Sequence, residues 1–492
     1  MSSRDFSASD RSGVPAASRH WAGHARPVGA PPVTTHGPQA GSEPINWWLI
    51  ALALGYALLS YVWLTPSIWV RLLLASFLIV RMRADIIIPY FISCLQLRLN
   101  FREGLSDVID IGTPDITAGQ TGFESYAFAI PPLLISVRTA IAVVDKRIDR
   151  SHFPWSLYLV WALGGILVVV GAFTILGSSP GWTGAMRMYS IVGGVFYGML
   201  MPRMTSKQVD RLAAGLGCVC LAYFTTLLTV SFGGKLTFVI APMGAAWAAS
   251  QLLSRKRFVL ASILLAVTGY VCLFKGTFMM LGTWVWALMA TCIGQFTSLN
   301  RRHRNGPFAI CVVATAVFCA VLFYYGVTRN ITENQKFDTS LLGRIEYKLY
   351  ADRGPIWYGC VTSLMEEPSL LPTPERAFYI EWLGFDRLWP FGPHNLVLEL
   401  LNQLGMVAGA IAIAVMAYAV WGCVGAVGRD ASSGVRSLAT AAICSILVGG
   451  LTFPYSVGDR LGENIVFTAG LAIANSWGWY GSPPQAREVV RG

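Results

Sequence analysis

The chain has 492 residues, of which 54% are hydrophobic and only 13% are charged, and its formal net charge is +11. Ordinary soluble domains carry about 25% charged residues, so this composition excludes them. Long apolar runs recur from Asn46 to Tyr480, and charges are confined to the gaps between them. This pattern predicts an all-α polytopic membrane protein and not a β-barrel, whose strands would alternate over short segments.

The first 45 residues differ from the rest of the chain. They are rich in Ser, Ala, Gly and Pro and show no apolar periodicity. Because such a sequence cannot bury a hydrophobic core, we expect residues 1–45 to form a disordered cytoplasmic tail. Three histidines lie in this tail, but they are too dispersed to form a closed set of metal ligands.

Fourteen apolar segments follow the tail, and each predicts a membrane helix. They cover residues 46–64, 67–80, 84–98, 126–144, 156–177, 188–202, 212–232, 236–253, 258–274, 277–298, 307–327, 394–424, 437–453 and 464–480. At ~1.5 Å per residue, the segment 67–80 spans about 21 Å, less than the ~30 Å of the hydrocarbon layer. This segment and 84–98 could therefore be tilted or re-entrant, so the expected number is 12–14 transmembrane helices.

The basic residues lie in alternate gaps between these segments. Most of the 37 Lys and Arg residues fall in the tail, in every second short gap, or after the last segment. Cytoplasmic loops retain positive charge, so these gaps are predicted to face the cytoplasm, and the longer stretches 99–125 and 328–393 to face outward. The net charge is therefore a topology signal, and it predicts no nucleic-acid partner.

This topology divides the chain into five predicted parts. They are the cytoplasmic tail 1–45, an N-terminal transmembrane bundle 46–327, an outer loop 328–393, the C-terminal transmembrane helices 394–480 and a cytoplasmic tail 481–492. The outer loop combines charged residues with Trp357, Tyr358, Trp382 and Trp389. Aromatic side chains with a polar edge are typical of a surface that lies on the bilayer and meets a sugar headgroup. We therefore expect the function to reside in this loop.

One histidine, His394, is predicted to face outward. It follows Pro393, so it is expected in the first turn of the membrane segment that begins there. The positive end of a helix dipole favours the neutral imidazole, which can accept a proton as a general base. The unpaired N–H groups of the same turn would suit a phosphate. The alternative is an interfacial histidine that anchors the helix end.

Polar residues continue into this membrane segment. Asn395, Glu399 and Asn402 are spaced at i, i+4 and i+7, which predicts one helix face that continues to Gly409. A carboxylate inside a membrane helix is costly without a partner, so this face should meet protein or a water-filled cavity. Gly405 and Gly409 form a small-xxx-small pair, which predicts close helix packing.

Four cations are candidates for holding a diphosphate. Arg344 and Arg353 lie in "GRIEYKLYADRGPIWYG", and a guanidinium matches phosphate oxygens; the alternative for each is an ion pair within the loop. Lys275 and Arg71 lie near the outer ends of their segments, where either could snorkel to lipid headgroups. No P-loop, GxGxxG, HExxH or Asp-x-Asp motif is present, so no metal or nucleotide cofactor is expected.

Two stretches resemble a known family. "PHNLVLELLNQLGMVAG" resembles the His-Asn, spacer and Gly-rich signature of the O-antigen ligase and polysaccharide polymerase superfamily, and "DRGPIWYGCVTSLMEEP" resembles its Arg-x-x-x-Trp stretch. Together they cover roughly residues 340–424. The resemblance implies a bacterial inner-membrane enzyme with the lipid-dependent glycosyltransferase (GT-C-like) architecture, one large periplasmic loop and no metal.

The resemblance also implies roles for individual residues. His394 falls on the family histidine and Arg353 on the loop arginine, while Lys275 stands where the family has an arginine at the end of an earlier helix. Lysine keeps the charge but loses the bidentate fork. Ala408 stands where a second glycine is commonly found. Substrate contacts are expected from Asn395, Glu399, Arg344, Arg71 and Trp357.

The implied reaction transfers a glycan from an undecaprenyl-diphosphate donor to a glycan or lipid-linked acceptor. We expect a polymerase of repeat units; the alternative is a ligase that joins the glycan to a lipid core. The expected partners are these substrates, membrane lipids and other polysaccharide-assembly proteins. Asp107, Asp110 or Asp115 could instead supply the base. A transporter of lipid-linked sugars would show internal repeats and broken helices, and the sequence contains no clear repeat; a structural subunit is the third reading.

Overall fold

The structure is a computed structural model. It describes short pieces of 209–228 and the ranges 237–255, 257–275, 278–299, 306–328, 340–371, 377–382, 385–389, 393–428 and 432–452. The two tails, Arg71, the acidic stretch 99–125 and the predicted helix 464–480 lie outside the described residues.

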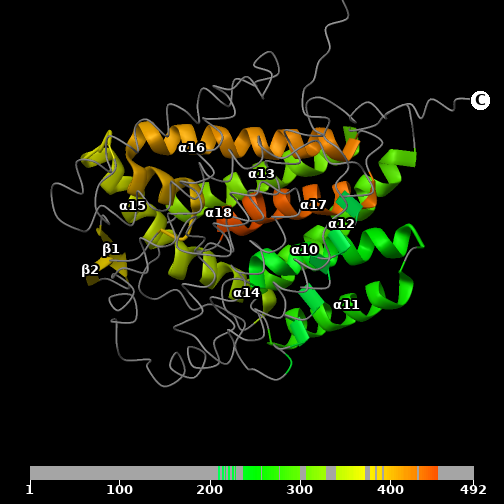
Figure 1. Ribbon diagram of the computed structural model, residues 1–492. Helices are drawn as coiled ribbons and strands as arrows, with labels where there is room; N and C mark the ends of the chain where they lie inside the picture. Colours follow the sequence, from blue (N-terminus) through cyan, green and yellow to red (C-terminus); the bar gives the residue numbers. More distant parts are fainter. Residues whose placement is uncertain are drawn as a thin grey trace, which may run out of the picture. The chain divides into compact units, whose positions relative to one another are not determined.

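The described residues are mostly helical, with one short β-hairpin (Figure 1). The longer helices are α10 (Thr237–Leu253), α11 (Phe258–Tyr270), α12 (Phe278–Leu299), α13 (Gly306–Thr328), α15 (Gly354–Glu366), α16 (Leu396–Gly428) and α17 (Ser433–Cys444). The short ones are α14 (Leu341–Glu346), α18 (Gly450–Thr452) and the π-helices η6 (Val271–Lys275), η7 (Tyr347–Arg353) and η8 (Ser445–Gly449). Strands β1 (Phe378–Trp382) and β2 (Phe385–Trp389) pair antiparallel.

Most of the apolar segments that fall in the described ranges form helices at the predicted positions. Helices α10, α11 with η6, α12, α13, and α17 with η8 and α18 match their predicted segments to within a few residues. Two helical stretches, Gly306–Thr328 and Leu404–Val427, are long and apolar enough to cross a membrane. The prediction of a helical chain with membrane-compatible helices is confirmed to this extent.

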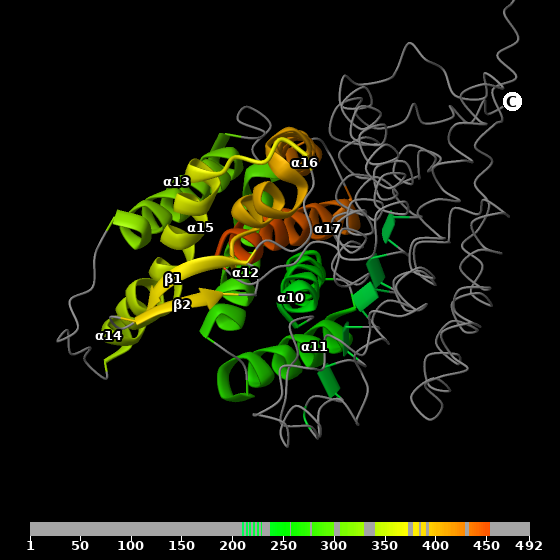
Figure 2. The same cartoon turned by 90° about the vertical axis from the view of Figure 1, so that its left-hand side faces the viewer.

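Among the described helices, α10 holds the central position. It packs against α11, α12 and α17, and Figure 2 shows α10 beside α12 and α17. Small side chains permit this close packing, because Ala245, Ala246 and Ala287 are fully buried together with Cys444. Polar bonds join the neighbouring helices, as where the indole N–H of Trp284 on α12 donates to the Thr268 hydroxyl on α11 at 3.0 Å. Because close packing of small side chains already stabilises the association of helices, few polar contacts between them are needed.

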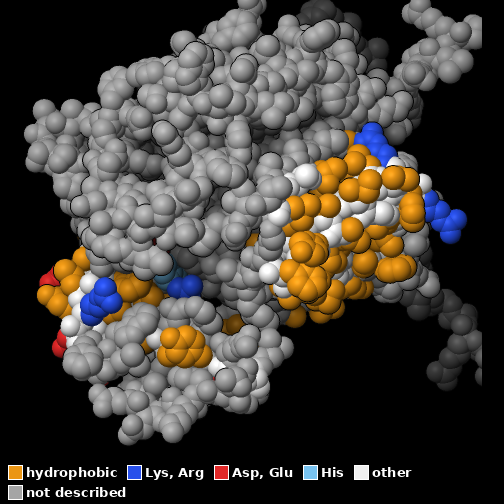
Figure 3. Space-filling model, turned by 90° about the horizontal axis from the view of Figure 1, so that it is seen from below, with side chains coloured by type: hydrophobic (Ala, Val, Ile, Leu, Met, Phe, Trp, Pro, Cys, Tyr) orange, Lys and Arg blue, Asp and Glu red, His pale blue; other side chains and the backbone are white. Residues whose placement is uncertain are grey.

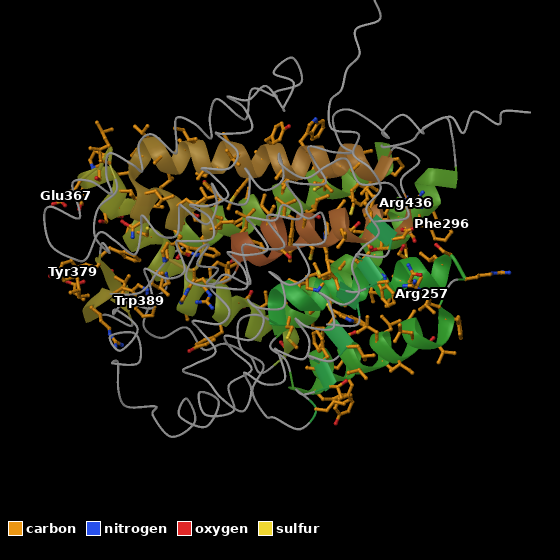
Figure 4. All side chains as sticks on the ribbon, in the orientation of Figure 1. Arg257, Phe296, Glu367, Tyr379, Trp389 and Arg436 are labelled. Carbon is orange, nitrogen blue, oxygen red and sulfur yellow. The ribbon has the colours of Figure 1, made fainter. Side chains whose placement is uncertain are left out.

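The connections between helices gather at two ends. In Figure 4, Arg257 and Arg436 lie at one end and Glu367, Tyr379 and Trp389 at the opposite end. Arg436 lies in the first turn of α17, where its guanidinium donates to the side-chain oxygen of Gln295 on α12. The basic connections and the β-hairpin therefore lie at opposite ends of these helices, as the alternation of basic gaps predicts.

The prediction of one continuous helix over residues 394–424 is wrong. Helix α16 is broken at Gly405, whose φ of 74° and ψ of 170° are not helical. This backbone region is essentially open to glycine alone, because a Cβ would clash with the chain. The break leaves a first half that ends at Leu404 and a second half that begins at Met406.

The segment that follows α15 satisfies the backbone groups freed by the break. The N–H of Met406 donates to the Ser369 carbonyl at 2.8 Å, and the N–H of Val407 donates to the Leu370 carbonyl at 3.4 Å. Such groups at the start of a helix have no partner within the helix and are costly when left unpaired in apolar surroundings. Residues 369–371 therefore act as the cap of the second half of α16.

The two glycines of the break permit close packing, as their spacing predicts, but not between two separate helices. A Cβ on Gly405 would lie 2.6 Å from the backbone of Leu371, and one on Gly409 would lie 2.8 Å from the Leu400 carbonyl oxygen. The close packing that this pair predicts is present, but it lies between the two halves of α16 and between α16 and Leu371. Both glycines let the chain approach itself closely at the break.

We expect Gly405→Ala to destabilise the protein by roughly 2 kcal/mol or more, because alanine would be strained at this φ and would overlap the Leu371 backbone. Gly282→Ala is the matched control. Gly282 lies inside α12 with open space around it, so alanine should be neutral or stabilise by about 0.5–1 kcal/mol. Thermal unfolding of the purified protein in detergent measures both. Equal melting temperatures for the two variants would contradict this account of the break.

Candidate functional site

A hydrophobic cluster around α15 positions the candidate site. Its buried members come from α15, from β1 and from the first half of α16, and they are Ile356, Trp357, Cys360, Leu364, Phe378, Ile380 and Leu398. Partly buried side chains from α13 and β2 pack against them. We call this group the α15 cluster. It joins the end of α13, the hairpin and the start of α16 into one packed unit.

Glycines let backbones meet around this cluster. A Cβ on Gly354 would lie 2.5 Å from the Gly326 carbonyl oxygen, so α13 and α15 approach each other at these two residues. A Cβ on Gly359 would overlap the Tyr379 carbonyl oxygen, so β1 lies directly on α15. Since glycine alone permits these approaches, the position of α15 between α13 and the hairpin is narrowly defined.

Trp357 lies in the α15 cluster and not at the surface. Its side chain is 2% exposed, and its ring centroid lies 5.3 Å from that of Phe323 on α13. The expectation of an exposed tryptophan that meets a sugar is therefore wrong for Trp357, because the close approach at Gly326 turns this face of α15 toward α13. The surface position is confirmed for the next residue, Tyr358, which is 52% exposed.

The predicted cations are distributed over several elements. Arg353 is half-buried at the end of η7, one turn before Trp357 and directly before α15. Arg344 lies in α14. Lys275 is the last residue of η6 and so lies at the far end of α11 from Arg257. Of these cations, Arg353 is the one that directly precedes α15, the helix that supplies most of the α15 cluster.

The start of α16 differs from the prediction. Helix α16 begins at Leu396, and Asn395 caps it: the side-chain oxygen of Asn395 accepts from the N–H groups of Val397 at 3.0 Å and Leu398 at 3.3 Å. His394 therefore lies before the cap, and the prediction that it sits in the first turn is wrong. Asparagine is among the best helix caps, and it occupies two of the N–H groups that were expected to suit a phosphate.

His394 is held at the edge of the α15 cluster. Its backbone is left-handed, with a φ of 58°, and its side chain is half-buried. The imidazole meets the Trp389 indole edge to face, with ring centroids 6.0 Å apart and an interplanar angle of 84°. Trp389 ends β2 and also packs against the α15 cluster. The hairpin thus connects His394 to the same packed unit that Arg353 borders.

A second contact fixes the start of α16 from the other side. The side-chain N–H of Asn395 donates to the Leu451 carbonyl on α18 at 3.0 Å. A Cβ on Gly450 would lie 2.8 Å from the Leu396 side chain, so α18 lies directly against the helix start. His394 is therefore placed by two neighbours in the chain, Trp389 before it and Asn395 after it.

The polar stripe of α16 is buried. Asn395 and Glu399 are each 4% exposed and Asn402 is 3% exposed, so the prediction that this face turns away from lipid is confirmed. The stripe ends at Gly405, where the helix breaks, and does not continue to Gly409 as expected. Buried polar groups of this kind are retained where they are bonded or functional, since burial alone is costly.

Three kinds of chemical group lie on the elements that form the α15 cluster or directly beside them. An imidazole at His394 can accept a proton, a guanidinium at Arg353 can hold negative charge, and a buried carboxylate at Glu399 can accept a hydrogen bond. In the part of the chain that the structure describes, no group of three or more His, Cys, Asp or Glu residues could hold a metal ion.

Sequence reasoning missed two residues that build this site. Trp389 contacts His394, whereas the sequence places it only among the loop aromatics. Asn395 caps α16 and does not simply face substrate; an asparagine directly before an apolar helical run is a usual cap signal. Comparisons of the chain with family models, with curated proteins and with solved structures found no match. In the described part of the chain the protein is mostly helical, and two helices there are long and apolar enough to cross a membrane.

We expect Asn395→Ala to lower the stability of the protein by about 1–2 kcal/mol, because it removes both the helix cap and the bond to Leu451. Asn395→Ser should retain the cap and lose only the bond to Leu451, so it should cost about 1 kcal/mol or less. Thermal unfolding in detergent compares the two variants. If serine proves as damaging as alanine, the side chain does not cap α16.

Proposed function

We propose that the chain is a glycosyltransferase of the bacterial inner membrane, related to the O-antigen ligases and polysaccharide polymerases. It transfers a glycan from an undecaprenyl-diphosphate donor to an acceptor sugar hydroxyl, and so polymerises repeat units of a surface or exopolysaccharide. The observation that carries this proposal is the meeting of the two family-like stretches at the α15 cluster. Arg353 borders this cluster at the start of α15, and His394 borders it through Trp389.

Membrane insertion is supported by the surface of α13. Only 17% of the most apolar part of this helix is buried inside the protein. Large apolar side chains on α13 face outward, with Ile310 69% exposed and Phe318 61% exposed. Such a surface is suited to lipid and not to water. A multi-pass orientation with the hairpin end in the periplasm agrees with the basic connections at the other end.

The proposed chemistry is a single displacement. His394 takes the proton of the acceptor hydroxyl while that oxygen attacks the anomeric carbon of the donor sugar. The bond from this carbon to the diphosphate breaks, and its electron pair leaves with undecaprenyl diphosphate. Arg353 and Lys275 hold the negative charge that develops on the leaving group. The configuration at the anomeric carbon is inverted, and His394 then releases its proton to water.

The contacts of Asn395 and Trp357 give these two residues structural roles in place of the expected substrate contacts. Asn395 caps α16 and bonds Leu451, so its proposed part is to position His394. Trp357 is buried and holds α15 against α13. Glu399, Arg344 and Arg71 are retained as proposed substrate residues.

The broken helix favours a second candidate, a transporter of lipid-linked sugars. Transporters commonly bind their substrates at helices interrupted within the membrane, and α16 is interrupted at Gly405. The two functions differ in their products. A transporter moves the lipid-linked glycan intact, whereas a transferase forms a new glycosidic bond and releases undecaprenyl diphosphate.

We expect His394→Asn to reduce glycan transfer roughly 100-fold or more, as removal of a general base does. Asparagine tolerates the left-handed φ of 58°, so the backbone should be retained while the imidazole is lost. The assay gives purified full-length protein an undecaprenyl-diphosphate-linked repeat unit and resolves products by length. Normal elongation by this variant would refute the base assignment. Intact donor translocated by the wild type without bond formation would instead support the transporter.

Arg353→Gln should reduce the same transfer rate roughly 10- to 100-fold, because the charge that stabilises the leaving diphosphate is lost. Arg353→Lys should retain part of the rate, since it keeps the charge but not the bidentate fork. The matched control is Arg387→Gln, an exposed arginine on β2 of the same outer region, which should leave the rate unchanged. Equal losses in the Arg353 and Arg387 variants would indicate a general electrostatic effect and contradict the role given to Arg353.

A further inference from the structure

Helix α11 presents one wholly apolar face to its surroundings. The exposed residues recur every three or four positions and continue into η6; they are Val259, Ile263, Ala266, Tyr270 and Phe274. Val259 is 71% exposed and Phe274 is 73% exposed. The opposite face, with Ala261, Leu264 and Thr268, is buried in the protein. Figure 3 shows a broad apolar surface of this kind, with basic side chains at one of its ends.

The length of this face matches a bilayer. The 13 residues of α11 and the five of η6 form one continuous run from Phe258 to Lys275. At ~1.5 Å per residue, the run spans roughly 27 Å, close to the ~30 Å hydrocarbon layer. An outward apolar stripe of this length is suited to the acyl chains of lipids.

Two exposed arginines stand at the start of this face. Arg255 and Arg257 are both left-handed, with φ of 51° and 46°, in the tight turn between α10 and α11. Left-handed non-glycine residues cost free energy, and two in three positions are uncommon. The turn is held by backbone bonds, including one from the N–H of Arg255 to the Leu252 carbonyl at 3.0 Å. Figure 4 shows Arg257 extending away from the helices.

The chain supplies no nearby negative charge for these arginines in its sequence. From residue 211 to residue 332 there is no Asp or Glu at all. The α10–α11 hairpin therefore carries positive charge at the end of an apolar face and contains no acidic residue of its own. Arginine forks match phosphate oxygens, so the complementary ligand has a negatively charged phosphate and a long apolar part.

We propose that this surface binds an anionic phospholipid, with the phosphate against Arg255 and Arg257 and the acyl chains along the exposed face of α11. This site is separate from His394 and the α15 cluster. The proposal depends on the insertion of the chain in a membrane and not on glycosyl transfer. A negative result in the transfer assay would therefore not contradict it.

The test uses the purified full-length protein in neutral detergent, titrated with phosphatidylglycerol or phosphatidylcholine, with bound lipid counted by native mass spectrometry. A basic residue near an anionic lipid surface contributes about 1 kcal/mol, or about fivefold in affinity. The double variant Arg255→Asn with Arg257→Asn should therefore bind phosphatidylglycerol about 25-fold more weakly. Asparagine accommodates a left-handed backbone, so folding should be preserved.

Three controls make the outcome decisive. Arg255→Lys with Arg257→Lys should retain most of the binding, and Arg387→Asn, at the other end of the described helices, should retain all of it. If the double asparagine variant fails to fold, the single variant Arg257→Asn should still show the fivefold loss. The proposal is overturned if the asparagine variants bind phosphatidylglycerol like the wild type or if Arg387→Asn weakens binding equally. Complete displacement of the lipid by inorganic phosphate also overturns it, because that result indicates a phosphate site without a lipid contact.

Discussion

The structure around the candidate site depends on one constraint, which is that backbone N–H and C=O groups in apolar surroundings must find partners within the protein. The break of α16 at Gly405 frees such groups within an otherwise apolar helix. The carbonyls of Ser369 and Leu370 accept from the start of the second half. The segment after α15 is thereby fixed to α16, and with it the whole unit formed by α15 and the hairpin.

The same constraint explains the start of α16. The side chain of Asn395 satisfies two N–H groups of the first turn and bonds the Leu451 carbonyl. The first half of α16 is therefore a short helix tied at both ends, with Glu399 and Asn402 buried along it. His394 precedes this helix, and its backbone is left-handed, with a φ of 58°. A residue so restrained is held in one orientation, as the proposed role of His394 as a general base requires.

Much of the helical framework could be predicted from the sequence. Apolar runs such as 258–274 and 307–327 became helices close to their expected bounds, because hydropathy over a long window is a strong signal that neighbours rarely override. The stripe of Asn395, Glu399 and Asn402 also lies on a buried face as expected. The sequence could not predict that the stripe ends at Gly405, since a glycine in an apolar run is compatible with both a continuous helix and a break.

Composition and periodicity by themselves thus determined that this chain is helical, which segments are apolar and which residues could carry chemistry, because those properties depend on residues close in sequence. Only the tertiary structure decided that Trp357 is buried, that Trp389 contacts His394 and that residues 369–371 cap the second half of α16. Each of these facts depends on a contact between separate elements of the fold, such as the close approach of α13 and α15 at Gly326 and Gly354. Such contacts follow from how the whole chain packs, and local sequence patterns carry little information about them.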